Sequence, residues 1–143
     1  MAINECIPKY EPGADLSGQC TADVIGKRFL RLSGDKQGVE RVSDDVSGGN
    51  VRVAMANPAN DSGRIVGVSG YNATAGRKVK IVRGPGKVVP VEAGTAIPVF
   101  AEVATDAVGR AIPFVQGTTG RAVGYVIRAV TGAGVESLVN LYV

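Results

Sequence analysis

Short apolar runs rich in β-branched residues alternate with glycine-rich turns along most of the chain. In the run Lys78-Val79-Lys80-Ile81, polar and apolar residues alternate strictly, which predicts a strand with one face in water. The predicted strands cover residues 18–25, 28–33, 50–56, 64–69, 77–83, 87–91, 96–103, 111–116, 122–130 and 135–143. Short strands at this spacing predict an all-β fold, built as a compact small β-barrel or sandwich.

Two segments depart from this pattern. Residues 1–15 hold Pro8 and Pro12, which exclude a helix and predict an extended N-terminal arm. Residues 34–49 are mostly charged or small and predict a long polar surface loop. We therefore expect an arm at 1–15 followed by a single β domain at 16–143, with the polar loop at 34–49.

The composition supports a β domain and argues against most enzymes. Val and Ile far outnumber Leu and Met, and branching at Cβ favours strands. Three prolines, Pro90, Pro98 and Pro113, lie inside apolar runs and predict strand edges, strand starts or bulges there. The chain has no His, so it lacks the usual general base and the commonest metal ligand. We expect no catalytic residues, no cofactor and no metal.

The charges nearly balance, with 16 Lys and Arg against 13 Asp and Glu. One basic run has no acid within it, and it predicts either a face for phosphate or an acidic protein, or an ordinary solvated strand face. This candidate basic face consists of Arg77, Lys78, Lys80, Arg83 and Lys87. No aromatic residue lies within 77–87, which disfavours a single-stranded nucleic-acid site, because such sites stack bases on aromatic rings.

Cys6 and Cys20 are the two thiols of the chain. The first ten residues include Glu5 and Pro8 and lack a long apolar core, so we expect no export signal and two free cysteines. No apolar run approaches the roughly 20 residues of a membrane span.

Two short motifs have better structural than catalytic explanations. Asp61-Ser62-Gly63 matches the aspartic-protease tripeptide, but the polar residues 57–60 precede it where that site needs an apolar strand. The glycine-rich residues 84–87 lack the phosphate-loop spacing and a following helix. Both motifs predict turns.

The order of several motifs along nearly the whole chain resembles that of the small decoration (cement) proteins of tailed bacteriophages. The matching segments are the arm Ile7-Pro8-Lys9-Tyr10-Glu11-Pro12-Gly13, residues 26–29, 63–68, 75–76, 83–91, 93–97 and 122–125, and the end Asn140-Leu141-Tyr142-Val143. At residues 97–100 the chain departs from the pattern, which affects the strand boundary expected there.

The resemblance implies a non-enzymatic virion protein with a β-barrel-like or β-tulip-like core. It would be made in the host cytoplasm, would assemble as a homotrimer, and would bind the major capsid protein on the outer capsid surface, without a membrane. Candidate capsid-binding residues of the arm are Ile3, Glu5, Ile7, Pro8, Lys9, Tyr10 and Pro12. Residues 122–143 are strongly apolar, and the candidate trimer contacts there are Tyr125, Ile127, Leu141 and Tyr142.

Two alternatives remain open at the level of sequence. A basic OB-like module would bind nucleic acid and would show a steep salt dependence. Residues 12–16 also resemble the first motif of trimeric dUTPases, which would imply a nucleotide hydrolase, although the other motifs of that family are absent.

Overall fold

β-Strands make up all of the regular structure that the computed structural model describes, in residues 15–34, 51–56 and 65–143. No helix occurs within these ranges, so the expected all-β class is confirmed. The strands are β1 (Leu16–Cys20), β2 (Phe29–Gly34), β3 (Val51–Met55), β4 (Ile65–Ser69), β5 (Lys78–Val82), β6 (Val88–Glu92), β7 (Glu102–Thr105), β8 (Ala111–Pro113), β9 (Gly124–Val126) and β10 (Glu136–Leu141). Residues 1–14 of the arm expected at 1–15 lie outside the described residues, as does all but the first residue of the loop expected at 34–49. The division into arm and single domain stays a prediction.

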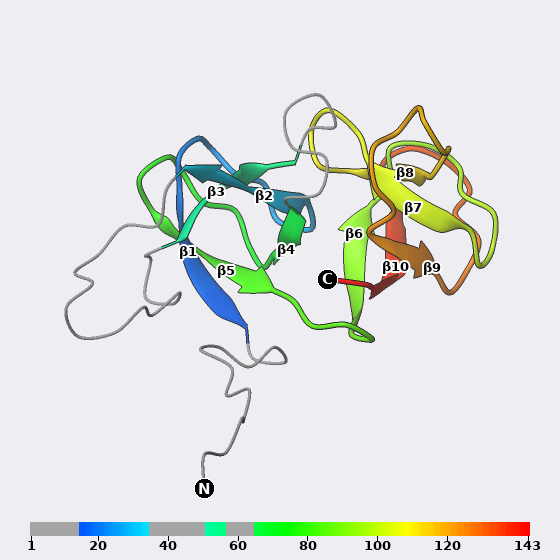
Figure 1. Cartoon of the computed structure of the whole chain (residues 1–143), viewed down its shortest axis with the longest axis horizontal. Helices are drawn as coiled ribbons and strands as arrows, with labels where there is room; N and C mark the ends of the chain where they lie inside the picture. The colour runs from blue at the N-terminus through cyan, green and yellow to red at the C-terminus, as the bar shows by residue number, and fades with distance from the viewer. Residues whose placement is uncertain (1–14, 35–50, 57–64) are drawn as a thin grey trace, which may run out of the picture.

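The first five strands close into a barrel in the order β1-β3-β2-β4-β5, shown to the left in Figure 1. Closure comes from β1, which pairs in parallel with β3 and antiparallel with β5. Leu30, Val53, Val79 and Ile81 fill the interior of the barrel. On β5 the exposed Lys78 and Lys80 alternate with the buried Val79 and Ile81, as the sequence predicts. Gly18 lies where a Cβ would stand 2.9 Å from the Ile81 side chain, so a larger residue would require that side chain to shift.

The second five strands form an antiparallel sheet in the order β6-β10-β9-β7-β8, called the second sheet below. A bridge between Ala93 and Ala111 brings its two edges together. Pro90 and Pro113 lie on the edge strands β6 and β8, where a missing amide hydrogen does not interrupt the sheet, as expected from the sequence.

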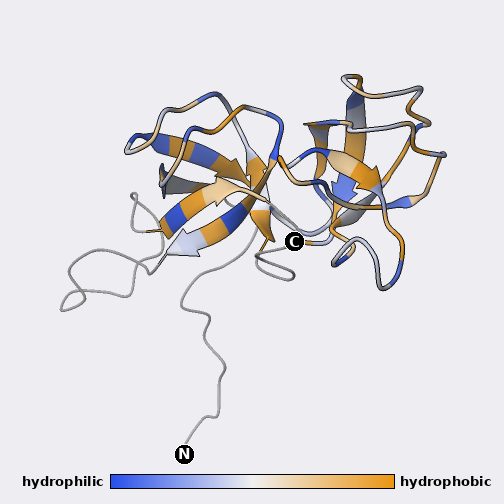
Figure 2. Cartoon of the chain, turned by 90° about the horizontal axis from the view of Figure 1, so that it is seen from above, coloured by the Kyte–Doolittle hydropathy of each residue, from blue (hydrophilic) through white to orange (hydrophobic). Residues whose placement is uncertain are grey.

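The barrel and the second sheet share a hydrophobic core. Figure 2 shows that the strands of both regions carry hydrophobic residues, in orange. Phe29 on β2 faces Val68 on β4, and both side chains point out of the barrel toward the second sheet. There they pack in one cluster with buried residues such as Val91, Val139 and Leu141. The two regions are therefore joined by buried apolar surface rather than by a flexible linker.

Polar contacts reinforce this junction at the turn before β2. The Phe29 amide donates to the Gly109 carbonyl at 2.8 Å, and the Glu92 amide donates to the Lys27 carbonyl at 2.9 Å. Arg28 forms an ion pair with Glu92, and Lys27 forms one with Glu136 at 2.6 Å. Lys27 itself has φ 60, a left-handed conformation that fixes the direction of the turn.

Four of the predicted strands differ from the structure by more than two residues at one end, and one of them, expected at 111–116, ends at Pro113 in β8. The expected strand at 96–103 is wrong over most of its length, because β7 begins only at Glu102. Residues 97–101 form a turn in which the Ala101 amide donates to the Pro98 carbonyl at 3.2 Å and Phe100 has φ 62. The strands expected at 18–25 and 122–130 are shorter than expected, since β1 ends at Cys20 and β9 covers only Gly124–Val126.

Candidate interaction surfaces

The arm residues singled out from the sequence, Ile3 to Pro12, lie outside the described part of the chain. Asp15 is the first described residue, and it lies against the turn between β5 and β6. Its carboxylate contacts the Lys87 ammonium at 2.8 Å and the Lys80 ammonium at 3.2 Å, and it accepts a hydrogen bond from the Arg83 amide at 3.4 Å. The chain therefore enters the barrel at a fixed, charged point.

Asp15 changes the electrostatics of the candidate basic face. Partial burial acts to raise the pKa of Asp15, but the hydrogen bonds from Lys87, Lys80 and the Arg83 amide outweigh burial and hold the pKa below its usual value. Two of the five predicted basic residues are thus paired with an acid that is distant in sequence. Sequence reasoning missed this partner because it considered charges only within 77–87.

Arg77 and Lys78 remain exposed on the barrel. Lys78 lies opposite Gln19 across the β1–β5 pair, and the Gln19 side-chain Nε2 donates to the Gly76 carbonyl at 3.1 Å. An exposed aromatic ring, Tyr71, follows Gly70, whose amide donates to the Lys80 carbonyl at 2.9 Å. This surface can attract an anionic partner, but a single ring is less than the row of aromatic side chains used by typical single-strand binders.

The outward face of the second sheet carries an apolar stripe. Leu138 on β10 lies opposite Pro90 on β6, and on the other side of β10 the Ile127 amide donates to the Leu138 carbonyl at 3.0 Å. The next row places Val88 opposite Asn140, and Asn140 opposite Tyr125. We call Val88, Pro90, Tyr125, Ile127, Leu138 and Tyr142 the outer face. An apolar patch that extends over neighbouring strands is typical of a protein-binding surface.

Three of the four candidate trimer contacts lie on this outer face, and one does not. Tyr125 and Tyr142 pack against each other with ring centroids 6.1 Å apart, and the Tyr142 hydroxyl donates to the Glu102 carboxylate at 3.0 Å. Burial and this hydrogen bond to Glu102 raise the pKa of Tyr142. Leu141 is 1% exposed and belongs to the shared core, because alternate residues of β10 point to opposite faces.

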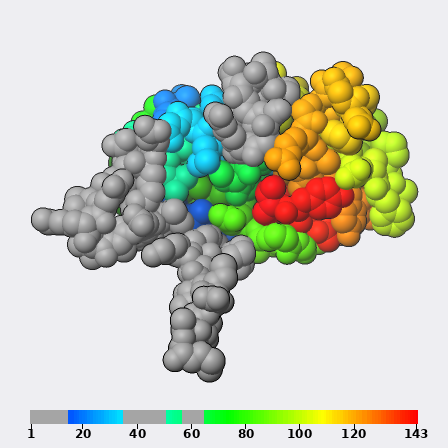
Figure 3. Space-filling view, viewed as in Figure 1, coloured from blue at the N-terminus to red at the C-terminus, as the bar shows by residue number. Residues whose placement is uncertain are grey.

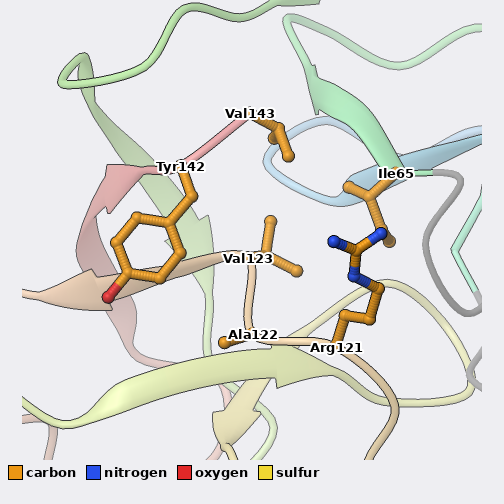
Figure 4. A pocket seen from close by; sticks show the side chains of 6 residues that line it. All are labelled: Ile65, Arg121, Ala122, Val123, Tyr142 and Val143. Atoms are coloured by element: carbon orange, nitrogen blue, oxygen red, sulfur yellow. The ribbon is translucent and has the colours of Figure 1, made fainter.

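A cavity of about 220 Å³ lies beside the outer face, at the junction with the barrel. Its walls are Ile65 of the barrel, Ala122 and Val123 before β9, and Tyr142 and Val143 after β10, with Arg121 at its edge. Figure 4 shows the Arg121 side chain extending toward Ile65, with Val123 between them and Tyr142. In Figure 3 the C-terminal residues, in red, lie at the surface between the barrel and the segment that carries Arg121.

The described ranges hold no cluster of side chains of the kind that binds a metal ion. No group of three or more His, Cys, Asp or Glu side chains gathers in residues 15–34, 51–56 and 65–143. Cys20 is a free thiol inside the barrel, where burial raises its pKa and so keeps it protonated, whereas Cys6 lies outside the described residues.

Within residues 15–34, 51–56 and 65–143, no helix has the length and apolar character needed to cross a membrane.

No protein-family model matches the chain, and no curated protein matches its sequence. A match does exist among solved structures, in the N base of the head fiber gp8.5 of bacteriophage phi29. The match covers 90% of this chain and 92% of that one, with a TM-score of 0.62 and 17% sequence identity. The two proteins share a fold. The likeness extends over both the barrel and the second sheet, since it covers nearly the whole chain.

Proposed function

We propose that this chain is a structural, non-enzymatic protein of a tailed-phage virion, bound to the outer surface of the capsid, where it stabilises the lattice of the major capsid protein. The observation that carries the proposal is the fold shared over 90% of the chain with the base of a phage head fiber. The order of motifs along the sequence, which resembles phage decoration proteins, supports the same role independently.

The surfaces of the molecule suit such a role. We propose that the outer face mediates self-association into a homotrimer, since Val88, Ile127 and Tyr142 are exposed in the single chain, with Tyr125 and Leu138 half-buried among them. A trimer engages three equivalent capsid sites at once, so a modest affinity per site becomes strong retention. The arm and the exposed Arg77 and Lys78 are the proposed contacts with capsid protein.

The test uses shells of the parent phage that lack this protein. The purified chain should co-sediment with the shells in a saturable manner and raise the temperature at which they disrupt. Deletion of residues 2–13 should weaken this binding at least tenfold while leaving the melting temperature of the free protein within a few degrees, because the arm is proposed to bind the capsid rather than its own domain. Absence of saturable binding by the full chain would refute the proposed function.

A nucleic-acid-binding module is the second candidate, favoured by the five-stranded barrel and by the exposed Arg77, Lys78 and Tyr71. It predicts retention of single-stranded DNA with a steep loss on added salt. The wild-type chain distinguishes the two functions, since salt-sensitive retention of single-stranded DNA without saturable binding to shells would favour the nucleic-acid module. If the module binds nucleic acid, the Arg77→Glu/Lys78→Glu variant should abolish such retention. A separate nucleotide-hydrolysis assay tests the hypothesis that the chain is a dUTPase-like enzyme.

A further inference from the structure

Phe100 combines two unfavourable features in a single residue. Its side chain is 70% exposed, the most among the large apolar side chains described, and its backbone has φ 62. A bulky residue in the left-handed region is strained, and such strain persists only where surrounding contacts hold it. Neither the exposure nor the strain helps the single chain to fold, which points to a role outside it.

The backbone around Phe100 is firmly fixed. The Phe100 amide donates to the Val126 carbonyl at 3.0 Å, and the Ile97 amide donates to the Val130 carbonyl, also at 3.0 Å. The neighbouring Val99 is exposed as well. Val99 and Phe100, called the knob below, therefore form a rigid apolar projection that loses little conformational entropy when it binds.

The size and lining of the cavity beside Tyr142 suit the aromatic ring of Phe100. At about 220 Å³ it is smaller than the roughly 300–1,000 Å³ of small-molecule sites, and it suits a side chain better than a metabolite. Val123, Ala122 and Val143 provide apolar walls. The guanidinium of Arg121 at the edge can lie over the face of an aromatic ring in a cation–π contact.

The knob and the cavity lie at opposite ends of β9. Ala122 and Val123, which precede the strand, line the cavity, whereas Val126, its last residue, holds the knob. Phe100 is not among the residues that line the cavity and remains 70% exposed, so it does not fill the cavity of its own chain. Two separate, complementary patches on one subunit make a head-to-tail contact between copies, and repetition of that contact closes a ring if the rotation allows. The outer face, with Tyr125 between the two patches, would then face the axis of the ring.

We propose that Phe100 of one copy of this chain inserts into the Arg121–Tyr142 cavity of a neighbouring copy. The proposal rests on the self-association that forms part of the proposed function, and it identifies the contact by which neighbouring subunits recognise each other. We assign the occupant of the cavity to a second copy because the chain itself presents a rigid, exposed aromatic residue, Phe100. The cavity has the size of a side chain, has apolar walls and carries the Arg121 guanidinium at its edge.

The first test separates assembly from stability at residue 100. Phe100→Gly removes the ring and relieves the left-handed strain, so the melting temperature should stay equal or rise while light scattering shows at least a tenfold weaker association. If Phe100 only supported its own subunit, the melting temperature would fall. Val115→Ala, at another exposed apolar residue, is the matched control and should assemble normally. A Phe100→Gly protein that assembles like the wild type, or a wild-type chain that is monomeric at 100 μM, would overturn the proposal.

The second test asks which residues meet between copies. In a Cys6→Ser/Cys20→Ala background, one protein carries Phe100→Cys and a second carries Ala122→Cys. Mild oxidation of the mixture should produce a mixed disulfide dimer far in excess of that formed when Val115→Cys replaces Phe100→Cys. Equal yields from the two mixtures would exclude the contact. These experiments need no capsid, so their failure is distinct from failure to bind shells.

Discussion

The barrel and the second sheet differ in what they show to solvent. Among the described residues, three large apolar side chains are exposed in the part of the chain that forms the barrel, against eight in the part that forms the second sheet. In the barrel they are Ile25, Leu32 and Tyr71; in the second sheet they are Val88, Val99, Phe100, Val108, Val115, Ile127, Val135 and Tyr142. The outer side of β5 instead carries the exposed Lys78 and Lys80.

This difference indicates a division of roles. An antiparallel sheet with one face on a core needs polar residues on its other face, and β5 of the barrel follows this rule. The outer face of the second sheet departs from this rule at the exposed Val88 and Ile127, although Glu136 and Asn140 of β10 point the same way as Leu138. An apolar residue at an exposed position gives a single chain no advantage in folding, so we infer that the second sheet carries the protein-binding surface while the barrel provides a scaffold and charge.

The largest expected effect comes from separating the two regions at their shared core. Phe29→Ala removes a ring that is 0% exposed and that reaches from the barrel into the core of the second sheet. Replacement of a buried Phe by Ala costs about 3–5 kcal/mol because a cavity remains. The free energy of unfolding, measured by urea denaturation, should fall by this amount.

Leu32 is the matched control for Phe29, since it lies on the same strand but is 40% exposed. Leu32→Ala should change the free energy of unfolding by less than about 1 kcal/mol. Similar losses for the two variants would mean that the barrel and the second sheet do not depend on a common core.

A smaller loss is expected from crowding inside the second sheet. At Gly124, an added Cβ would meet the Asn140 carbonyl oxygen of β10 and would lie 2.7 Å from the Val139 side chain. Because the backbone must move, Gly124→Ala should lower the free energy of unfolding by about 1–3 kcal/mol and disturb the outer face. At Gly132 an added Cβ meets nothing within 4 Å, so Gly132→Ala should be neutral or slightly stabilising. Equal effects at both glycines would contradict the packing of β9 on β10.

Local pattern was enough to predict most of the strands. The alternation in 78–81 and the apolar runs predicted as strands at 87–91 and 135–143 correspond closely to β5, β6 and β10, in which every second side chain is buried. The turn at 97–101 was missed, because an apolar Phe in a left-handed conformation has no signal in sequence. Likewise, nothing local shows that Leu141 points inward while Tyr142 points outward, since a one-residue shift of register exchanges the two faces.

Contacts between residues far apart in the chain could not be predicted from the sequence. The pairing of Asp15 with Lys87 joins residues 72 positions apart, and the cavity joins Ile65 to residues 121–123 and 142–143. The sequence identified the basic run and the apolar end of the chain, but the surfaces that they form depend on how the barrel and the second sheet pack together.

The ion pairs across the junction allow a finer test of how the two regions are joined. Arg28 is mostly buried, pairs with Glu92 and also donates to the Val108 carbonyl at 3.0 Å. Arg28→Ala should therefore lower the free energy of unfolding by about 1.5–3 kcal/mol, the range for hydrogen bonds to charged groups. A double-mutant cycle with Glu92→Gln measures the coupling between the two side chains.

The matched control is the neighbouring pair of Lys27 with Glu136, in which both side chains are well exposed. The hydrogen bond from Lys27 lowers the pKa of Glu136, but water and salt screen an exposed pair. Lys27→Ala should therefore leave the melting temperature nearly unchanged. A larger loss for Lys27→Ala than for Arg28→Ala would show that burial does not determine the strength of these pairs.

The smallest effect is expected where the chain enters the barrel, at Asp15. The folded-state pKa of Asp15 lies below its ordinary value of 3.8, so its pairing with Lys87 and Lys80 stabilises the fold fully above that value and is lost as the pH falls through the lower, folded pKa. Asp15→Asn should lower the free energy of unfolding at pH 7 by up to about 1 kcal/mol. The difference between wild type and variant should shrink toward zero below pH 3.8, and it should also shrink in 1 M salt at pH 7, because salt screens a partly exposed pair. A difference that stays constant between pH 7 and the acid limit would mean that Asp15 acts through packing or a neutral hydrogen bond. The charged entry point of the barrel would then have no electrostatic role in stability.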